Sequence, residues 1–233
     1  MDAAQREILA GNLKRVRERI AAACARVNRD PKEVTLIAVT KTVGPEVIQA
    51  LIELGVTDIG ENKLQAAKEK FPHVPGLRDR TKVKRHFIGH LQTNKVKGVL
   101  ELFDVIHSVD SVKLAEEINK RAARAKQDIK CFVELNVSGE ASKEGFSPEE
   151  FGECTDKIVL LPDLWFRGYM TMAPQTLNPE EVRPVFRKLA KLVRAWSETS
   201  ATYLSMGMSN DFEIAIEEGA THVRIGTALF EGL

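Results

Sequence analysis

The sequence contains few cysteines, no excess of either charge and no long apolar run. Among its 233 residues are only three cysteines, Cys24, Cys131 and Cys154, which lie far apart. An odd number at such spacing fits neither a disulfide framework nor a zinc site, so we expect reduced, buried thiols. Basic and acidic residues number 34 and 33, which provides no net field to attract nucleic acid or an anionic membrane. A small-molecule partner is therefore favoured.

Signals for secretion or membrane insertion are also missing. The opening segment alternates charged and apolar residues, whereas a secretory signal has an unbroken apolar region. No run approaches the ~20 apolar residues that a membrane-spanning helix needs. The basic segment 70–86 resembles a short nucleic-acid patch, but a solvated loop is the simpler interpretation. We expect a cytoplasmic protein with no membrane or nucleic-acid partner.

Strand-like and helix-like segments alternate along the chain. An opening amphipathic helix has apolar residues near one face, namely Ile8, Leu9, Leu13, Val16 and Ile20. The predicted strands that follow are 34–40, 57–60, 84–89, 103–109, 129–137, 164–170, 202–206 and 222–226. The predicted helices include 45–55, 111–125, 147–161, 178–198 and 209–219. The 43% hydrophobic content suits one large core, so we expect residues 1–233 to form a single domain.

Eight repeats of a strand and a helix predict an α/β fold, a single TIM (β/α)8 barrel with an extra N-terminal helix. The alternative is an open doubly wound sheet, but no G-x-G-x-x-G follows the first predicted strand. In a barrel, functional sites gather at the C-terminal ends of the strands, and phosphate is often bound after strands seven and eight. Functional residues are therefore expected at those ends.

One lysine stands at such an end. Lys41 directly follows the apolar run 34–40, which should be buried. Most lysines in this position are solvated cations at the start of a loop. The alternative is an amine that attacks a carbonyl carbon and forms an imine.

The ends of the seventh and eighth predicted strands could bind an anion. Gly207 and Gly226 permit close backbone approach, and Ser209 and Thr227 carry hydroxyl donors just before predicted helices. Together these features suit a phosphate. Taken separately, each is an ordinary turn before a capped helix, with Ser209 or Asn210 as the N-cap.

An imine-forming lysine opposite a phosphate site matches the two ends of pyridoxal 5'-phosphate (PLP), an aldehyde and a phosphate monoester. Arg224, in the eighth predicted strand, would then approach the ring. An arginine beside the pyridine nitrogen keeps it unprotonated because two cations repel, and so weakens the ring as an electron sink. The alternative for Arg224 is an ion pair in a barrel layer or at the surface.

Six ordered segments carry a family resemblance over nearly the whole chain. They are LIAVTKT, GENKLQ, HFIGHLQTNK, LNVSGEASKEG, RGYMTMAP and SMGMSNDFEIAIEEGATHVRIGTALF. The sequence resembles the pyridoxal phosphate homeostasis proteins, also called the PROSC family, whose barrel is related to the alanine racemase N-terminal domain. The resemblance implies a Schiff base at Lys41. It also implies PLP contacts from Asn62, Ser205, Met206, Ser209, Arg224, Gly226 and Thr227.

This family is understood to buffer, protect or deliver its cofactor. The resemblance therefore implies a carrier in intracellular vitamin B6 homeostasis that turns over no substrate, with PLP-dependent apoenzymes as candidate recipients. Two alternatives remain open. One is a PLP-dependent amino-acid racemase or decarboxylase, and the other is a PLP-sensing regulatory module that acts through a protein partner.

The residues also argue against turnover. A racemase on this barrel needs an acid or base on each face of the substrate carbon, and the related racemases take the second group from an added C-terminal domain of a partner subunit. We expect this chain to lack that domain and to be a monomer. Its only tyrosines, Tyr169 and Tyr203, fall inside predicted strands, where packing is the expected role.

Two histidines and a second lysine complete the candidates. His86 and His90 flank the end of the third predicted strand, but no carboxylate or cysteine of suitable spacing accompanies them, so no metal is expected. Their segment is expected to line the cofactor mouth or to cap the next helix at Thr93 or Asn94. Lys143 is a second amine near a strand end, and an exposed loop lysine is its simpler interpretation.

Overall fold

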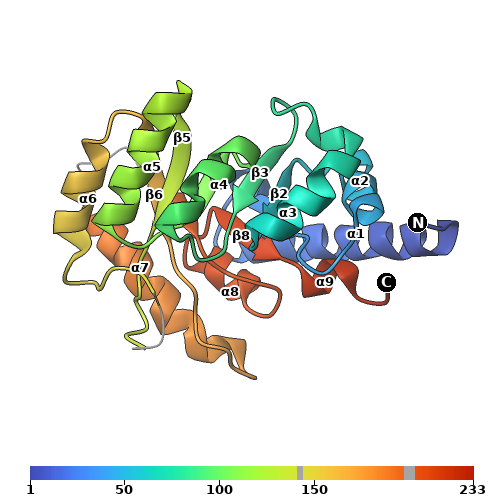
Figure 1. Cartoon of the computed structure of the whole chain (residues 1–233). Coiled ribbons are helices and arrows are strands. Elements are labelled where there is room, and N and C mark those ends of the chain that lie inside the picture. Colours follow the sequence, from blue (N-terminus) through green and yellow to red (C-terminus); the bar gives the residue numbers. More distant parts are fainter. Residues whose placement is uncertain (141–143, 197–202) are drawn as a thin grey trace.

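The computed structural model describes residues 1–140, 144–196 and 203–233. Eight parallel strands form a closed barrel in chain order, and pairing of the last strand with the first closes it (Figure 1). The predicted TIM barrel is therefore confirmed, and the open doubly wound sheet is wrong. The strands are β1 (Thr35–Val39), β2 (Asp58–Glu61), β3 (Lys84–Phe87), β4 (Val105–Val109), β5 (Ile129–Glu134), β6 (Leu164–Met170), β7 (Tyr203–Ser205) and β8 (His222–Ile225).

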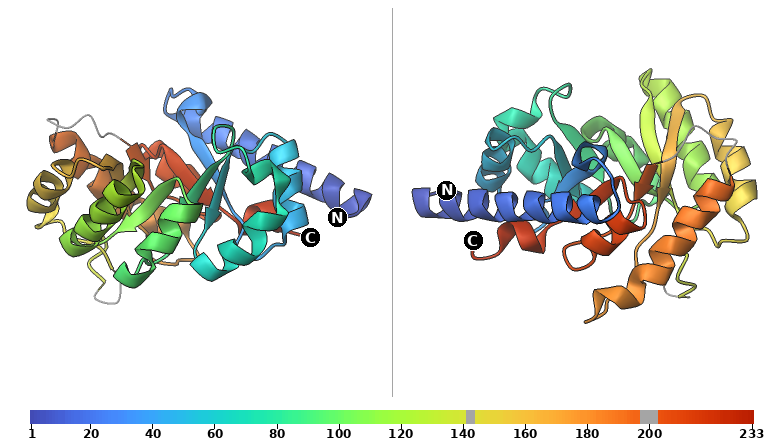
Figure 2. Two further views of the ribbon diagram at one scale, coloured as in Figure 1. Left: turned by 45° about the horizontal axis from the view of Figure 1, so that its top comes forward. Right: turned by 180° about the vertical axis from the view of Figure 1, so that it is seen from behind.

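Helices surround the barrel, as the views in Figures 1 and 2 show. None of those in the described ranges is long and apolar enough to cross a membrane. The α-helices are α1 (Ala3–Arg26), α2 (Pro45–Glu53), α3 (Leu64–Lys70), α4 (Val96–Leu102), α5 (Val112–Ala125), α6 (Phe151–Val159), α7 (Arg183–Ala195), α8 (Phe212–Glu217) and α9 (Thr227–Phe230). Short 3-10 turns are η1 (Pro31–Glu33), η2 (Phe71–His73), η3 (Pro75–Leu77), η4 (Thr93–Lys95) and η5 (Pro179–Val182).

The extra N-terminal helix α1 packs against α8 and α9, so the two ends of the chain lie close together (Figures 1 and 2). The amide of Asn12 donates to the carbonyl oxygens of Leu229 and Glu231, at 3.0 and 2.8 Å. The expected apolar face is buried except at Ile8, which is 39% exposed. Its buried members are Leu9, Leu13, Val16 and Ile20.

Burial follows the pattern of a parallel barrel, whose strands are covered on both faces. All five residues of β4 are buried, including His107. The three cysteines are free and buried, as predicted. Tyr169 is fully buried, with its hydroxyl 2.7 Å from that of Thr155, and Tyr203 is partly buried and packs against Val105, Phe132 and Met170. The packing role expected for both tyrosines is confirmed.

Two predicted helix starts are wrong. Helix α8 begins after Asp211, whose Oδ1 accepts from the amide of Met208 at 2.6 Å, so neither Ser209 nor Asn210 is its N-cap. Thr93 and Asn94 lie within the 3-10 turn η4 and do not cap α4. In both places a local turn precedes the helix, so the helix begins later in the sequence than predicted.

A strand and a helix are shorter than predicted. The fifth strand ends at Glu134, and Leu135 makes only an isolated bridge with Phe146. The predicted helix 178–198 opens as η5, and its α-helical part starts just before Pro184 and ends at Ala195. Residues 197–198 of that helix and Thr202 of the seventh predicted strand lie outside the described residues.

Replacement of Gly168 by alanine should destabilise the barrel. A Cβ at this position would lie 1.9 Å from the carbonyl oxygen of Tyr203 on the neighbouring strand. Because backbone must move to relieve that overlap, we expect the free energy of unfolding to fall by about 2 kcal/mol or more. Urea unfolding measures the change.

Gly11→Ala is the matched control, because nothing lies within 4 Å of a Cβ there. In the interior of α1 this exchange should stabilise by roughly 0.5 to 1 kcal/mol. Equal effects at the two glycines would contradict the proposed clash.

Candidate functional site

A cavity of about 720 Å³ opens at the C-terminal ends of the strands. Six of the eight predicted cofactor residues line it: Lys41, Asn62, Ser209, Arg224, Gly226 and Thr227. Ser205 and Met206 are fully buried and are not among its lining residues. The Met206 amide donates to the carbonyl of His222, at 3.1 Å. The barrel thus brings together a lysine, an arginine and two polar turns from distant parts of the sequence.

Lys41 stands just past the end of β1, with an exposed side chain on a fixed backbone. The preceding residue, Thr40, is fully buried, and its amide donates to the carbonyl of Gly60 at 2.9 Å. Within the described residues, the Lys41 amine has no hydrogen bond or ion pair. It is therefore an amine held at the cavity mouth and open to a ligand.

A buried ion pair anchors this backbone, and sequence reasoning missed it. The Lys70 amine donates both to the carbonyl of Thr40 and to the Glu61 carboxylate, each at 2.9 Å. The Thr40 hydroxyl donates to the same Glu61 oxygen at 2.9 Å. Glu61 is fully buried, and its other oxygen, Oε2, is the one buried side-chain polar atom without a partner among the described residues. These contacts of Lys70 and Glu61 with Thr40, which we call the clamp, hold in place the residue that directly precedes Lys41.

The turns after β7 and β8, which the sequence offers as a phosphate site, contact each other through Ser209. The Ser209 hydroxyl oxygen accepts from the amides of Gly226 and Ala228, both at 3.3 Å. Gly207 has a φ of +94°, and a Cβ there would meet the Cβ of Ala215 at 2.6 Å. Two amides therefore converge on one oxygen at the cavity wall, an arrangement that an anionic oxygen could also use.

Arg224 is buried at the cavity and held by neutral oxygens. One amino group donates to the carbonyl and hydroxyl oxygens of Ser205, both at 2.8 Å, and the other donates to the carbonyl of Thr171 at 3.1 Å. No carboxylate of the described chain pairs with it, so the ion-pair alternative is wrong. Burial lowers the pKa of the Arg224 guanidinium to about 10, against the opposing effect of Glu134 and Asp211.

Glu134, at the end of β5, is a second buried ionisable group of the cavity. Burial raises the pKa of its carboxyl to about 7, Arg224 opposes that rise, and Asp110 and Glu144 add to it. Nothing in the sequence alone selects this residue, because its environment comes from other strands. At neutral pH the cavity can therefore hold or release a proton here.

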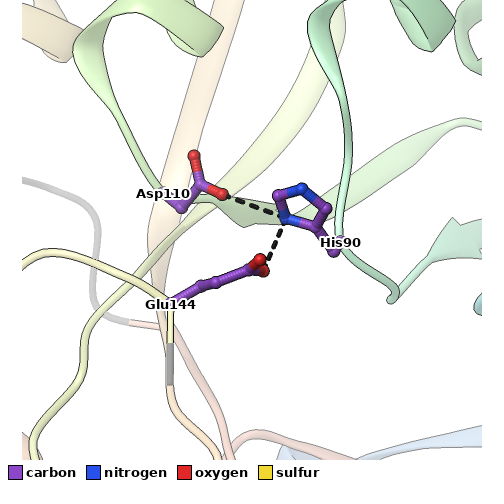
Figure 3. A group of neighbouring side chains, drawn as sticks. All are labelled: His90, Asp110 and Glu144. Atoms are coloured by element: carbon purple, nitrogen blue, oxygen red, sulfur yellow. Dashed lines mark ion pairs between the residues drawn. The ribbon is translucent and has the colours of Figure 1, made fainter. Parts of the chain in front are cut away.

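A histidine and two carboxylates meet at the rim (Figure 3). Nδ1 of His90 is 3.3 Å from Oδ2 of Asp110 and 2.5 Å from Oε2 of Glu144. The expectation that no carboxylate accompanies His90 is thus wrong, because Asp110 directly follows β4 and Glu144 lies in the loop after β5. Their ligand atoms lie within 4.8 Å of one another and could hold a metal ion, but the direct contacts of His90 with the two carboxylates also account for the group.

The other two candidates lie elsewhere. His86 does not pair with His90, because it points into the barrel, where its ring nitrogens contact Asp58 and His107, both at 2.9 Å. Ile88, Gly89 and His90 line the cavity, as expected for this segment. Lys143 lies outside the described residues.

Comparison with known proteins gives consistent matches over the whole barrel. A family model described as alanine racemase, N-terminal domain, matches residues 11–233. A pyridoxal phosphate homeostasis protein from Aquifex aeolicus is 44% identical over 223 residues, which cover 94% of this chain and 95% of the relative. A protein of the same name from Escherichia coli K12 is 37% identical over 228 residues, 95% of each chain.

Solved structures share the fold. PipY of Synechococcus elongatus without PLP matches with a TM-score of 0.82 and 32% identity, covering 92% of this chain and 99% of PipY. The structure of PipY with PLP bound gives 0.77 and 33%, with 91% and 99% covered. An alanine racemase from Clostridium difficile gives 0.73 at 15% identity, covers 96% of this chain and 59% of the racemase, and indicates a likeness of fold alone.

Removal of the Lys70 charge should destabilise the protein. The Lys70→Met variant leaves the fully buried Glu61 carboxylate without its cation, so we expect a loss of about 3 kcal/mol in the free energy of unfolding. The double variant Lys70→Met/Glu61→Gln should recover much of that loss. Urea unfolding of the three proteins provides the values.

Lys157→Met is the matched control, because Lys157 pairs with Glu153 on the exposed surface of α6. Its effect should be below about 1 kcal/mol. If Lys70→Met lowers the free energy of unfolding no more than this control does, the clamp does not exist as described.

The raised pKa of Glu134 predicts a pH dependence of stability. The folded protein binds this proton more tightly than the unfolded chain, so the contribution is complete below pH 4.5 and is lost as pH rises through about 7. Relative to Glu134→Gln, the wild-type free energy of unfolding should fall by up to about 3 kcal/mol across this range. Unfolding of both proteins at several pH values measures it.

Glu7→Gln removes an exposed carboxyl from α1 and serves as control. Its profile should follow that of the wild type. Parallel profiles for wild type and Glu134→Gln would show that Glu134 titrates as an ordinary surface carboxyl.

Proposed function

This chain belongs to the family of pyridoxal phosphate homeostasis proteins, and from that premise we propose that it binds PLP reversibly as a Schiff base on Lys41. The observation that carries the proposal is the cavity, which brings Lys41 together with Arg224 and the turn of Ser209, Gly226 and Thr227. The structure of a relative, PipY, with PLP bound supports it. The Lys41 amine is open to an aldehyde, as the proposal requires.

The residues at the cavity fit the three parts of the cofactor. PLP supplies an aldehyde and, in enzymes, a ring that withdraws electrons. Lys41 would hold the aldehyde carbon. The amides of Gly226 and Ala228, which already converge on the Ser209 hydroxyl, would donate to phosphate oxygens. Asn62 and Arg224 would contact the ring from the cavity wall, and the contacts expected from Ser205 and Met206 remain part of the proposal.

Arg224 favours a carrier over an enzyme. A cation held beside the ring nitrogen disfavours a proton there, so the ring is a weaker electron sink. Its hydrogen bonds go to neutral oxygens, so no carboxylate of the described residues pairs directly with the guanidinium. We propose that the protein buffers or delivers PLP without substrate turnover, as a cytoplasmic, single-domain monomer that requires no metal. PLP-dependent apoenzymes are the proposed recipients.

Replacement of Lys41 by alanine should abolish covalent capture of PLP. The wild type, mixed with PLP, should develop a visible absorption band, and borohydride should fix the adduct on the peptide that contains Lys41. Lys41→Arg is the matched variant, because it keeps the charge and cannot form an imine. Absorption spectra and peptide mapping of the three proteins make the test.

Lys143→Ala controls for adventitious amines and should behave as the wild type. If Lys41→Arg still forms the band, with the adduct on another lysine, the assignment of the site is wrong. Amino acids added to the loaded wild type should not be consumed in proportion to protein. Steady conversion would instead support the racemase or decarboxylase alternative.

A further inference from the structure

A line of hydrogen bonds crosses the barrel interior from the start of β2 to the cavity. Nε2 of His86 is 2.9 Å from Oδ1 of Asp58, and Nδ1 of His86 is 2.9 Å from Nε2 of His107. Nδ1 of His107 is 2.8 Å from the hydroxyl of Ser205, which in turn accepts from Arg224 at 2.8 Å. Five side chains from β2, β3, β4, β7 and β8 are thus connected end to end.

The Arg224 end of this line, together with the acceptors within reach of Ser205, indicates the direction of each hydrogen bond. A guanidinium can only donate, and a carboxylate can only accept. The Ser205 oxygen accepts from Arg224, and Nδ1 of His107 is the one acceptor that the described residues offer to its hydrogen, so we infer that this hydrogen is directed to Nδ1. His107 must then donate from Nε2 to His86, which donates from Nε2 to Asp58. With the hydrogens placed in this way, each imidazole carries hydrogen on Nε2 and accepts at Nδ1.

The surroundings of His107 support a neutral, fixed ring. It is fully buried and stacks on Phe132, with ring centroids 4.4 Å apart and planes inclined by 15°. Burial lowers the pKa of His107 well below its ordinary value, and the charge of Arg224 acts in the same direction. Among the described residues, the Ser205 hydroxyl has no acceptor other than this ring. Loss of His107 would leave that hydroxyl without an acceptor.

We propose that Asp58, His86 and His107 are positioning residues that, through Ser205, hold Arg224 in one orientation toward a ligand bound at Lys41. The guanidinium has its other contacts on backbone carbonyls of β7 and of the residue after β6. The inference rests on the proposed function for the identity of the ligand. The hydrogen-bond line itself exists in the protein without any ligand.

The direction of the line is testable without cofactor. Long-range proton–nitrogen correlation spectra of nitrogen-15-labelled protein report which ring nitrogen of each histidine carries hydrogen. We expect the neutral Nε2–H form for both His86 and His107, with assignment from His86→Gln and His107→Gln. The exposed His73 provides a reference signal. A charged ring, or hydrogen on Nδ1 of either residue, overturns the proposed direction.

The effect on Arg224 is tested with PLP as the probe. We expect Asp58→Ala and His107→Phe to weaken PLP binding about ten-fold, because one buried hydrogen bond to a charged group is lost or loosened. Both should also move the absorption band of bound PLP. Asp58→Asn and His107→Gln, which each keep an acceptor in place, should recover affinity and band position.

Phe132→Leu is the packing control, because Phe132 contacts His107 but makes no hydrogen bond in the line. It should change affinity by less than about two-fold and leave the band in place. Equal behaviour of His107→Phe and Phe132→Leu, or an unchanged Asp58→Ala, overturns the positioning role. If the His107 variants fail to fold, the Asp58 variants still test the positioning role, because the Asp58 side chain is partly exposed at the end of the line opposite Arg224.

Failure of the two proposals can be told apart. If wild-type protein forms no adduct on Lys41, the proposed function fails, and the nitrogen-15 spectra still decide the direction of the line. If the adduct forms but His107→Phe binds PLP like Phe132→Leu, or Asp58→Ala binds it like the wild type, the proposed function stands and the positioning role is overturned.

Discussion

Pairing of β8 with β1 is the constraint on which the site depends. The register sets Ile37 opposite Arg224 and Ala38 opposite Ile225. The residues that follow, Lys41 on one side and Gly226 with its turn on the other, are therefore brought to the same edge of the barrel. An open sheet of the same strands would leave them at opposite edges. Closure of the barrel thus creates the cavity, and the clamp of Glu61 and Lys70 on Thr40 holds one of its walls.

The sequence was sufficient for the fold and for much of the cavity. Eight strands, the N-terminal helix and six cavity-lining residues followed from periodicity, strand ends and family resemblance. The starts of the helices after Ser209 and after Thr93 did not, because the turn at Asp211 and the 3-10 turn at Thr93 depend on local hydrogen bonds. Glu61, Lys70 and Asp110 were missed for another reason. Each acts through a partner on a different element, so its role appears only when strand register brings the two together.

The interior of this barrel is more polar than the usual layers of branched apolar side chains. His86, His107, Ser205 and Arg224 all point inward and satisfy one another. A buried polar network of this kind rigidifies the residues it contains when every member is paired. The free-energy cost of burying the Arg224 charge is offset by hydrogen bonds to three neutral oxygens, two of Ser205 and one of Thr171. The same acceptors aim it at the cavity, so stability of the barrel and preparation of the site arise from one set of contacts.

The central claim is that Lys41 and the turn after β8 bind the two ends of one PLP molecule. A crystal structure of the protein grown with PLP tests it most directly. The account predicts continuous electron density between Nζ of Lys41 and the aldehyde carbon, with phosphate oxygens on the amides of Gly226 and Ala228. Density joined to another lysine, or phosphate bound away from these amides, would contradict it.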